Sequence, residues 1–361
     1  MKLFIDYETP DIPYGGGLQF LKALKKEIKR GIGIELARTI NSRVDMILVN
    51  GWSRGPRDHI DFRKIKNLKR HGFSNIWDLF FESFFEINTD KLTSRLFSKF
   101  NFPDLFYPIK NLFSDKVGVK IIHRVDGFRT LYSINSNFKI LEKSDLVQLK
   151  LLYNSDFLIF QSLYSYHCAK LLGYKGTNYE IINNGVNQEI FHPSKTALDP
   201  SAEKLKLLAV SWSPNLNKGF KLISEFSELE NVEVTFVGAW PKNLGSKNVK
   251  IIASLSNSEL AEFYRKNHAI ILASKYEACS NVALEGLSSG LPVLFIKSGS
   301  NTELCSNYGI QIDEDNLGLS VSKILKKYSY LRRKILNDRS KFGIQEVGKK
   351  YVDLFKKVNN N

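Results

Sequence analysis

Residues 268–296 constrain the fold of this 361-residue chain more than any other stretch. Their first six residues are apolar and favour a strand, and the polar run 274–280 is typical of a loop that leads into a helix. Gly290, with Pro292 just beyond it, is an ordinary helix stop signal, and Leu291 to Ile296 predict a second buried strand. In such a unit of strand, loop, helix and strand, the loop and the helix N-terminus lie where open α/β sheets bind ligands.

Two carboxylates frame this loop, Glu277 before the helix and Glu285 about one turn into it, with seven residues between them. Both can face the same crevice. The amides of Ser280, Asn281 and Val282 lie between them at the positive end of the helix dipole, which suits a phosphate. A nucleotide sugar needs this combination of hydroxyl acceptors around an anion site. On spacing alone, two glutamates without a role remain the better interpretation, because such pairs occur often by chance.

The surroundings of the pair favour the functional interpretation. The glutamates lie at a strand-to-helix junction and are followed by GLPVL, then by Gly299 and Glu303. This pattern resembles the retaining glycosyltransferases of family 4. The resemblance implies an α/β protein with the GT-B architecture, in which two Rossmann-like domains face a central cleft. It also implies that Glu277 contacts the donor-sugar hydroxyls near the reaction centre and that Glu285 contacts the ribose.

Length and composition agree with a two-domain globular protein. A chain of 361 residues suggests two domains of ordinary size, and 43% hydrophobic with 25% charged residues is typical of soluble proteins. No run approaches the roughly 18 apolar residues of a membrane span, and the N-terminus lacks a signal pattern. The three cysteines (Cys168, Cys279 and Cys305) form neither a zinc-site nor a disulfide pattern, so we expect a reducing cytoplasm.

The formal net charge of +15 leaves several partners open. Docking on the anionic inner face of a membrane and a simple lysine-rich coding bias explain the charge equally well. Nucleic acid is an unlikely partner, because no recognised binding motif accompanies the charge. We therefore expect a cytoplasmic protein, with peripheral membrane association as one alternative.

The chain opens on a strand, KLFID, followed by three glycines and a helix with apolar residues on one face. Strand, Gly-rich loop and helix is the order in which a backbone approaches a phosphate, although a triple glycine is often only a flexible turn. The segment GGGLQFLKAL resembles the N-terminal loop of family 4 enzymes. The resemblance implies that Gly16 and Gly17 approach the diphosphate or the acceptor.

The segment at about 55–115 fits the alternating plan poorly and is expected to be an irregular insertion. It is basic and then rich in phenylalanine. Such a segment can lie on a membrane or receive an acceptor, but clustered phenylalanines are more often core.

Val117 to Ile122 predict a strand that delivers HRVDG at its end. His123 or Asp126 can there bond a sugar hydroxyl or accept the acceptor's proton, and Asp126, beside a glycine, is our first choice. A loop salt bridge with Arg124 or Arg129 is the alternative. The resemblance implies a polar residue at about this point near the reaction centre.

The run NNGVNQEIFHP, residues 183–193, has turn chemistry and resembles the Asn-Gly-Val segment at the hinge of family 4 chains. We therefore expect an acceptor-side domain at 1–190 and a nucleotide-sugar domain at 191–340. Residues 341–361 are expected to form a helix that crosses back onto the first domain, with one apolar stripe. That stripe consists of Val347, Tyr351, Leu354, Phe355 and Val358.

Lys218 and Gly219 precede a predicted helix after the first strand of the second domain. A lysine there can neutralise donor phosphates, although alone it is better interpreted as an exposed helix residue. Family 4 members often carry an arginine five residues earlier, where this chain has Ser213. Either Lys218 and backbone amides suffice, or diphosphate affinity is weakened.

Together these motifs predict a retaining hexosyltransferase that moves a sugar from a nucleotide-diphosphate sugar to an unidentified glycan, lipid or small-molecule acceptor, as in glycan or cell-envelope biosynthesis. No metal and no cofactor is expected, because Lys218 and helix dipoles balance the leaving-group charge. The alternative is a non-catalytic protein that binds a sugar nucleotide or a polyanion, which Ser213 and the basic charge favour.

Overall fold

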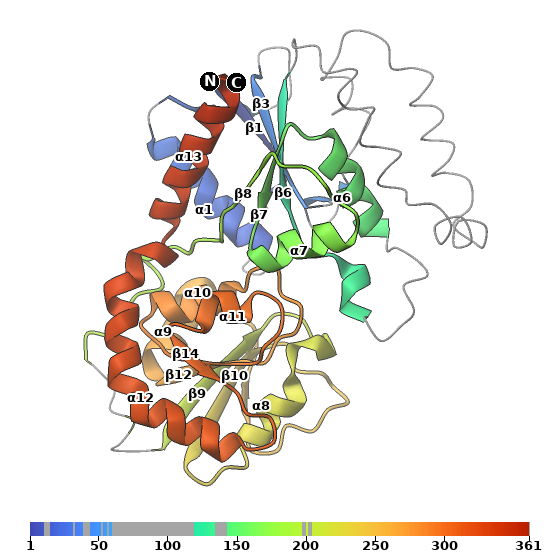
Figure 1. The fold of residues 1–361 in the computed structure, drawn as a ribbon. Helices are drawn as coiled ribbons and strands as arrows, with labels where there is room; N and C mark the ends of the chain where they lie inside the picture. The colour runs from blue at the N-terminus through green and yellow to red at the C-terminus, as the bar shows by residue number, and fades with distance from the viewer. Residues whose placement is uncertain are drawn as a thin grey trace, which may run out of the picture.

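The computed structural model contains two α/β domains, each with a six-stranded parallel sheet in its described part (Figure 1). The predicted insertion at about 55–115 lies almost wholly outside the described residues, so its proposed roles stay predictions. Only a short antiparallel hairpin at its start is described, formed by β4 (Ser53–Gly55) and β5 (Asp58–His59). The structure describes residues 1–10, 15–31, 33–38, 44–51, 53–55, 58–59, 119–133, 143–196, 200 and 204–360.

The first sheet has the order β2-β1-β3-β6-β7-β8 and all of its strand pairs are parallel. Parallel sheets are covered on both faces, and β3 is accordingly buried at every residue. The strands are β1 (Lys2–Asp6), β2 (Glu35–Leu36), β3 (Met46–Asn50), β6 (Lys120–Val125), β7 (Phe157–Phe160) and β8 (Tyr179–Ile181).

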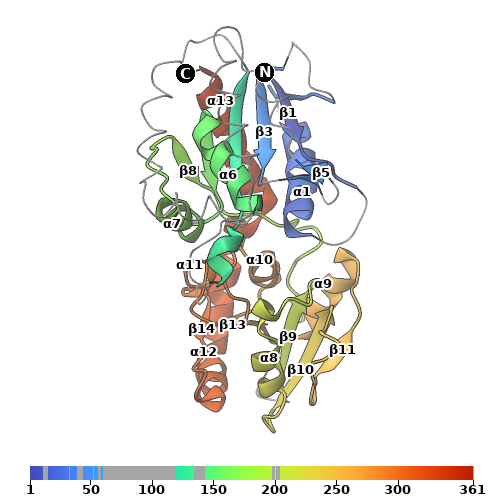
Figure 2. The same cartoon turned by 90° about the vertical axis from the view of Figure 1, so that its right-hand side faces the viewer.

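Helices cover both faces of this sheet. Figures 1 and 2 show α1 (Gly16–Arg30) and the terminal helix α13 (Ile344–Asn360) on one side and α6 (Lys143–Asn154) on the other. Leu21 of α1 and Tyr351 of α13 belong to one buried cluster with residues of β1, β3 and β6. A further helix, α7 (Leu163–Leu171), follows β7 and begins with a capping box.

The second sheet is also parallel, with the order β11-β10-β9-β12-β13-β14. β12 is buried throughout, as the apolar run of the organising unit predicts. The strands are β9 (Leu205–Ser211), β10 (Val232–Gly238), β11 (Lys250–Ile252), β12 (Ala269–Leu272), β13 (Val293–Phe295) and β14 (Gly309–Gln311).

The helices of the second domain follow its strands in turn. A capping box of Ser256 and Glu259 begins α9. None of the described helices is both long and apolar enough to cross a membrane. The helices are α8 (Phe220–Phe226), α9 (Asn257–Lys266), α10 (Asn281–Ser288), α11 (Asn301–Cys305) and α12 (Leu317–Asp338).

The chain crosses between the domains twice, and the two crossings lie side by side. Val186 on the first pairs with Gly343 on the second, and the Val186 amide donates to the Phe342 carbonyl at 2.9 Å. A Cβ on Gly185 would lie 2.9 Å from the Ile344 Cα, so only glycine allows this close approach. Beyond the second crossing α13 packs its predicted apolar stripe against the first domain.

Strand β6 differs from its prediction. We expected a strand at Val117 to Ile122 with His123 at its end, whereas the strand runs from Lys120 to Val125. The polar pair His123 and Arg124 is extended and buried because each side chain finds hydrogen-bond partners inside the protein. The sequence interpretation therefore ended β6 too early, because it took polar residues as the sign of a strand end.

The strand orders show where ligands can bind. In each sheet the order in which successive strands are added reverses once. This switch point lies between β1 and β3 in the first domain and between β9 and β12 in the second. Ligands of open α/β sheets bind beyond the carboxyl ends of the strands at such reversals. The loops after β1, β9 and β12 carry the glycines, Lys218 and Glu277, and the loops of the two domains meet between the sheets (Figure 2).

Candidate functional site

The N-termini of α1 and α10 meet between the domains. Asn281, the first residue of α10, donates from its Nδ2 to the carbonyl oxygen of Gly16 at 3.0 Å. A Cβ on Gly16 would lie 3.1 Å from that nitrogen, so the small residue permits the contact. Gly15, which precedes α1, has a φ of 95°, a conformation that favours glycine. The predicted Gly-rich loop and the predicted helix start are therefore neighbours.

The start of α10 offers free backbone donors. Ser280 caps the helix, and its Oγ accepts a hydrogen bond from the Ala283 amide at 3.4 Å. In the described part of the chain, the amides of Asn281 and Val282 have no acceptor. With the helix dipole behind them, such amides favour an anion.

Lys218 and Glu277 form an ion pair beside these helix ends. The Lys218 Nζ donates to Oε1 of Glu277, and each side chain is 24% exposed. Gly219, next to Lys218, has a φ of 74°, and a Cβ there would lie 2.4 Å from the Ala273 carbonyl oxygen. The close approach of these two loops thus brings two predicted site residues together.

The loop that carries Glu277 is held on both sides. Gly299 has a φ of 57°, and a Cβ there would lie 2.6 Å from the Glu277 nitrogen. The Ser300 amide donates to the Glu277 carbonyl at 2.9 Å. Tyr276 has a positive φ of 61°, which is uncommon for a bulky residue and marks a site held by its surroundings.

Glu285 contacts Tyr264 of α9, whose hydroxyl donates to its Oε2 at 2.9 Å. Burial raises the pKa of Glu285 to about 7, while the hydrogen bond from Tyr264 acts in the opposite direction. The carboxyl group therefore changes its protonation close to neutral pH. No sequence pattern pointed to Tyr264, which lies 21 residues away along the chain.

Asp126 lies directly after β6 and is partly buried. Its Oδ1 accepts from the Gly127 amide at 2.9 Å, and its own amide donates to Oε1 of Gln148 at 2.8 Å. Its Oδ2 would be 3.3 Å from a Cβ on Gly51, which follows β3. Asp126 thus belongs to the strand ends of the first sheet.

His123 lies inside β6 and is fully buried. Its Nε2 is 3.0 Å from the Gly51 carbonyl oxygen. Burial lowers the pKa of His123 to about 3, although the hydrogen bond with Gly51 acts in the opposite direction. The ring is therefore neutral at physiological pH.

Arg124 was weighed in the sequence only as an ion-pair partner of the neighbouring His123 or Asp126. In the structure it forms no ion pair with any described residue, and it donates instead to the side-chain oxygens of Asn50 and Asn184. The only sequence feature that could have indicated a buried role for Arg124 is the polar pair inside an otherwise apolar strand.

Asn184, on the hinge, connects Arg124 to the second domain. Its Nδ2 donates to Oδ1 of Asn281 at 2.8 Å, and its amide donates to Sγ of Cys279 at 3.4 Å. Burial raises the pKa of the Cys279 thiol to about 12, which keeps it protonated. Glu303, noted in the sequence, also joins the domains, because its Oε2 accepts from the Leu163 amide at 2.8 Å.

Ser213 lies in the loop between β9 and Lys218. Its carbonyl accepts from the Ser211 Oγ at 2.8 Å, and its own Oγ accepts from the Asn215 amide at 3.3 Å. The serine therefore shapes the loop and brings no charge to it.

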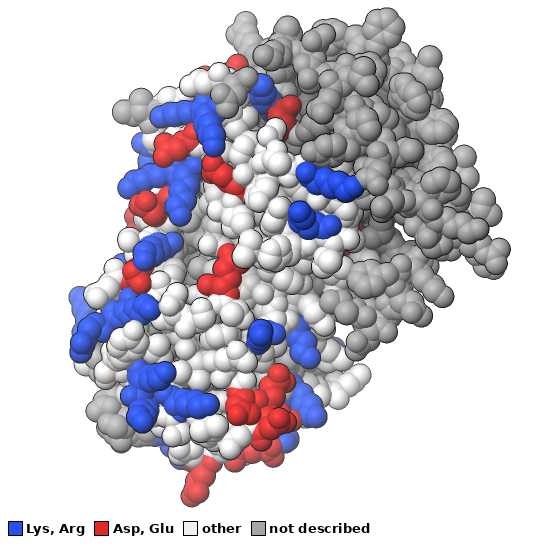
Figure 3. All heavy atoms as spheres, in the orientation of Figure 1, with Lys and Arg blue, Asp and Glu red and all other residues white. Residues whose placement is uncertain are grey.

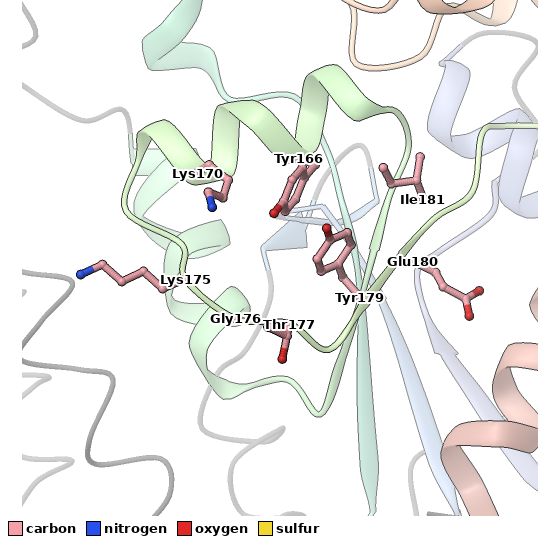
Figure 4. A pocket seen from close by; sticks show the side chains of 8 residues that line it. All are labelled: Tyr166, Lys170, Lys175, Gly176, Thr177, Tyr179, Glu180 and Ile181. Atoms are coloured by element: carbon pink, nitrogen blue, oxygen red, sulfur yellow. The ribbon is translucent and has the colours of Figure 1, made fainter.

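A separate depression of about 600 Å³ lies on the outer edge of the first sheet, at β8 and α7 (Figure 4). Tyr166 and Tyr179 stack there, with ring centroids 4.4 Å apart. None of the predicted site residues lines it. In the described residues, no group of three or more His, Cys, Asp or Glu is placed to hold a metal ion.

The described charges on the face of Figure 3 are mixed. Lysine and arginine side chains spread along α12 and α13, with acidic side chains between them. The basic charge on this face is therefore distributed and does not gather in one patch.

One protein-family model matches part of the chain. The family is described as glycosyl transferases group 1, and the match covers residues 215–335, which include Lys218, Glu277 and Glu285. No curated protein sequence matches the chain.

Solved structures match over almost the whole chain. Sucrose-phosphate synthase from Thermosynechococcus elongatus has a TM-score of 0.64 at 15% identity and covers 99% of this chain and 98% of its own. HepE from Anabaena, in complex with UDP, has a TM-score of 0.61 at 12% identity over 99% of both chains. Trehalose-6-phosphate synthase OtsA has a TM-score of 0.57 at 13% identity over 98% of both chains. The chain therefore has the GT-B fold of these glycosyltransferases, and its second domain carries the sequence pattern of group 1.

Proposed function

We propose that the protein is a retaining hexosyltransferase that uses a nucleotide-diphosphate sugar and needs no metal ion. The observation that carries this proposal is the meeting of the α1 and α10 N-termini at Gly16 and Asn281, beside the ion pair of Lys218 and Glu277. Two positive helix ends and a lysine form a strong anion site, and a carboxylate next to them can accept sugar hydroxyls.

The donor diphosphate binds between the two helix ends. The amides of Ser280, Asn281 and Val282, together with the backbone at Gly16 and Gly17, face its oxygens. Lys218 has three donors, so it can hold Glu277 and a phosphate oxygen together. These groups stabilise the negative charge that develops on the leaving group. The neighbour HepE was solved in complex with UDP, which supports a nucleoside diphosphate as the leaving group.

The two glutamates bind the sugars on either side of the diphosphate. Glu277 accepts from hydroxyls of the transferred sugar, and Lys218 orients its carboxylate. Glu285 accepts from the ribose, for which its ionised form is the better acceptor. Because burial raises its pKa to about 7, donor binding should strengthen as the pH rises through neutrality.

Asp126 is the residue that we place nearest the acceptor, because it lies at the end of β6 and its carboxylate is only partly buried. His123 is neutral and fully buried, so we assign it a supporting role through the Gly51 carbonyl. In the proposed step, the acceptor oxygen bonds to the anomeric carbon on the face that the phosphate leaves. The acceptor's proton passes to the departing phosphate oxygen, and the configuration is retained.

A transfer assay tests this function. The protein is incubated with UDP-glucose, GDP-mannose and ADP-glucose, with water or simple sugars as acceptors, and nucleotide release is followed. We expect release from one donor, a product with the donor's anomeric configuration by NMR, and loss of release in Glu277→Gln. Binding without any release would favour the non-catalytic alternative, and an inverted product would contradict the retaining mechanism.

A further inference from the structure

Arg124 is a buried cation in the centre of the first domain. Only 1% of its surface is exposed, and its guanidinium lies 4.4 Å from the centre of the Phe20 ring. No described carboxylate lies within 4.0 Å of it. A buried charge without a counter-charge costs several kcal/mol, so its presence requires an explanation.

The hydrogen-bond partners of Arg124 do not neutralise it. Its two terminal nitrogens donate to the side-chain oxygens of Asn50 and Asn184, which are neutral amides. Among the described residues, its Nε has no acceptor. Burial raises the pKa of the neighbouring Tyr351 to about 12, against the lowering effect of Arg124, so this phenol also stays neutral. Within the described part of the chain, the guanidinium is thus held by neutral dipoles and has no carboxylate within 4.0 Å.

The two asparagines lie at the two helix ends of the site. Nδ2 of Asn184 donates to Oδ1 of Asn281, the first residue of α10, at 2.8 Å. Nδ2 of Asn50 lies 3.5 Å from the position of a Cβ on Gly17, in the first turn of α1. The guanidinium is therefore located behind both helix N-termini, and each of its amide partners faces one of them.

We propose that Arg124 is a positioning residue whose buried charge helps to hold the donor diphosphate between the two helix ends, acting through Asn50 and Asn184. This inference rests on the proposed function, because it requires an anion at that place. In a site shielded from water, a charge acts over a longer distance than in solution. The bound diphosphate then supplies a negative charge, which no described carboxylate brings within 4.0 Å of Arg124.

A purely structural role makes a different prediction. If Arg124 only joined the two domains, any change at its partners would lower stability and weaken every ligand to the same degree. If it acts through its charge, a carboxylate placed opposite the guanidinium should leave the fold intact and selectively weaken ligands that carry a diphosphate. Diphosphate affinity would then fall while thermal stability would not.

Asn184→Asp and Asn50→Asp provide that carboxylate with almost no change in shape. Binding of UDP, GDP and ADP is measured by calorimetry on the full chain, and binding of the matching nucleosides by ligand-observed NMR. For Asn50→Asp we expect a Tm at least as high as that of the wild type, a loss of about tenfold or more in diphosphate affinity, and nucleoside affinity within about twofold. Asn184→Asp should lose diphosphate affinity as well, but at a lower Tm, because it also loses the hydrogen bond from its Nδ2 to Asn281. Asn187→Asp is the matched control, because its Oδ1 caps the Glu189 amide on the same hinge and it should bind like the wild type.

Arg124→Lys and Arg124→Met complete the series. Arg124→Lys keeps the charge and should retain more diphosphate affinity than Arg124→Met. If Arg124→Met does not fold, the aspartate variants still decide the test. The inference alone is overturned if the wild type binds a nucleoside diphosphate and Asn50→Asp binds it equally well, or loses the nucleoside to the same extent. If none of the three diphosphates binds the wild type, the proposed function fails as well.

Discussion

The side-chain Nδ2 of Asn281 lies 3.0 Å from the carbonyl oxygen of Gly16, so the first residue of α10 is joined to the first residue of α1. Asn281 also accepts from Asn184 at 2.8 Å. One side chain on the second domain therefore binds both the Gly-rich helix start and the hinge of the first domain. This contact places two helix dipoles and their free amides around one point.

Replacement of Asn281 by alanine should lower the free energy of unfolding. Asn281→Ala removes two hydrogen bonds, one to the Gly16 carbonyl and one from the Asn184 side-chain amide. At about 1 kcal/mol for each bond, we expect the free energy of unfolding to fall by roughly 1–3 kcal/mol in urea titrations. An unchanged urea midpoint would show that the two domains are held together without this residue.

Gly219 fixes the position of Lys218. In Gly219→Ala the new Cβ would lie 2.4 Å from the Ala273 carbonyl oxygen, at a φ of 74°. We expect a loss of about 2 kcal/mol or more in unfolding free energy and weaker diphosphate binding, because Lys218 must move. Gly245→Ala is the control, since a Cβ there meets nothing within 4 Å. Equal stability of the two variants would contradict the close packing of these loops.

Glu285 gives a pH dependence with a defined sign. Its pKa rises from 4.5 in the unfolded chain to about 7, chiefly through burial, so the folded state binds the proton more tightly. Stability is therefore greatest below the unfolded pKa and falls as the pH rises to about 7. Glu285→Gln removes this loss, and we expect its thermal stability relative to the wild type to increase between pH 5 and pH 8.

Glu259→Gln serves as the opposite case. Hydrogen bonds to Ser256 lower the pKa of Glu259, so its contribution is present at neutral pH and is lost on acidification. This variant should be less stable than the wild type at pH 7 and should approach it at low pH. If the thermal stabilities of Glu285→Gln and the wild type change in parallel with pH, the raised pKa of Glu285 is refuted.

The ion pair of Lys218 and Glu277 predicts energetic coupling between the loops after β9 and β12. Since both side chains are 24% exposed, we expect a coupling of about 1 kcal/mol in a cycle of Lys218→Met and Glu277→Gln. The cycle is measured by chemical denaturation without ligand. Additive effects within about 0.3 kcal/mol would mean that the two residues act independently.

Much of the architecture could be predicted from local patterns. The organising unit became β12, α10 and β13, because apolar runs bounded by glycine and proline specify where elements begin and end. The apolar stripe of α13 is buried as expected. The GT-B fold itself was expected from the resemblance of the motifs to family 4 and from their order. Local periodicity alone does not indicate that fold.

The candidate site was less accessible to sequence reasoning, because its key contacts join residues far apart in the chain. Arg124 and Asn184 are 60 residues apart, and Asn184 and Asn281 are 97 apart. The assignment of His123 to a strand end assumed that polar residues are exposed, whereas His123 and Arg124 are buried and form hydrogen bonds with Gly51, Asn50 and Asn184. Only tertiary structure reveals such partners.

The most direct test of the account is calorimetric titration of the wild type and Glu285→Ala with UDP, GDP and ADP. We predict that one of the three binds the wild type with a Kd on the order of micromolar, which corresponds to about 8 kcal/mol. Glu285→Ala should lose about 1–3 kcal/mol of this binding energy, as for a missing hydrogen bond to a charged group. The absence of binding by all three, or equal binding by the variant, would contradict the donor site proposed here.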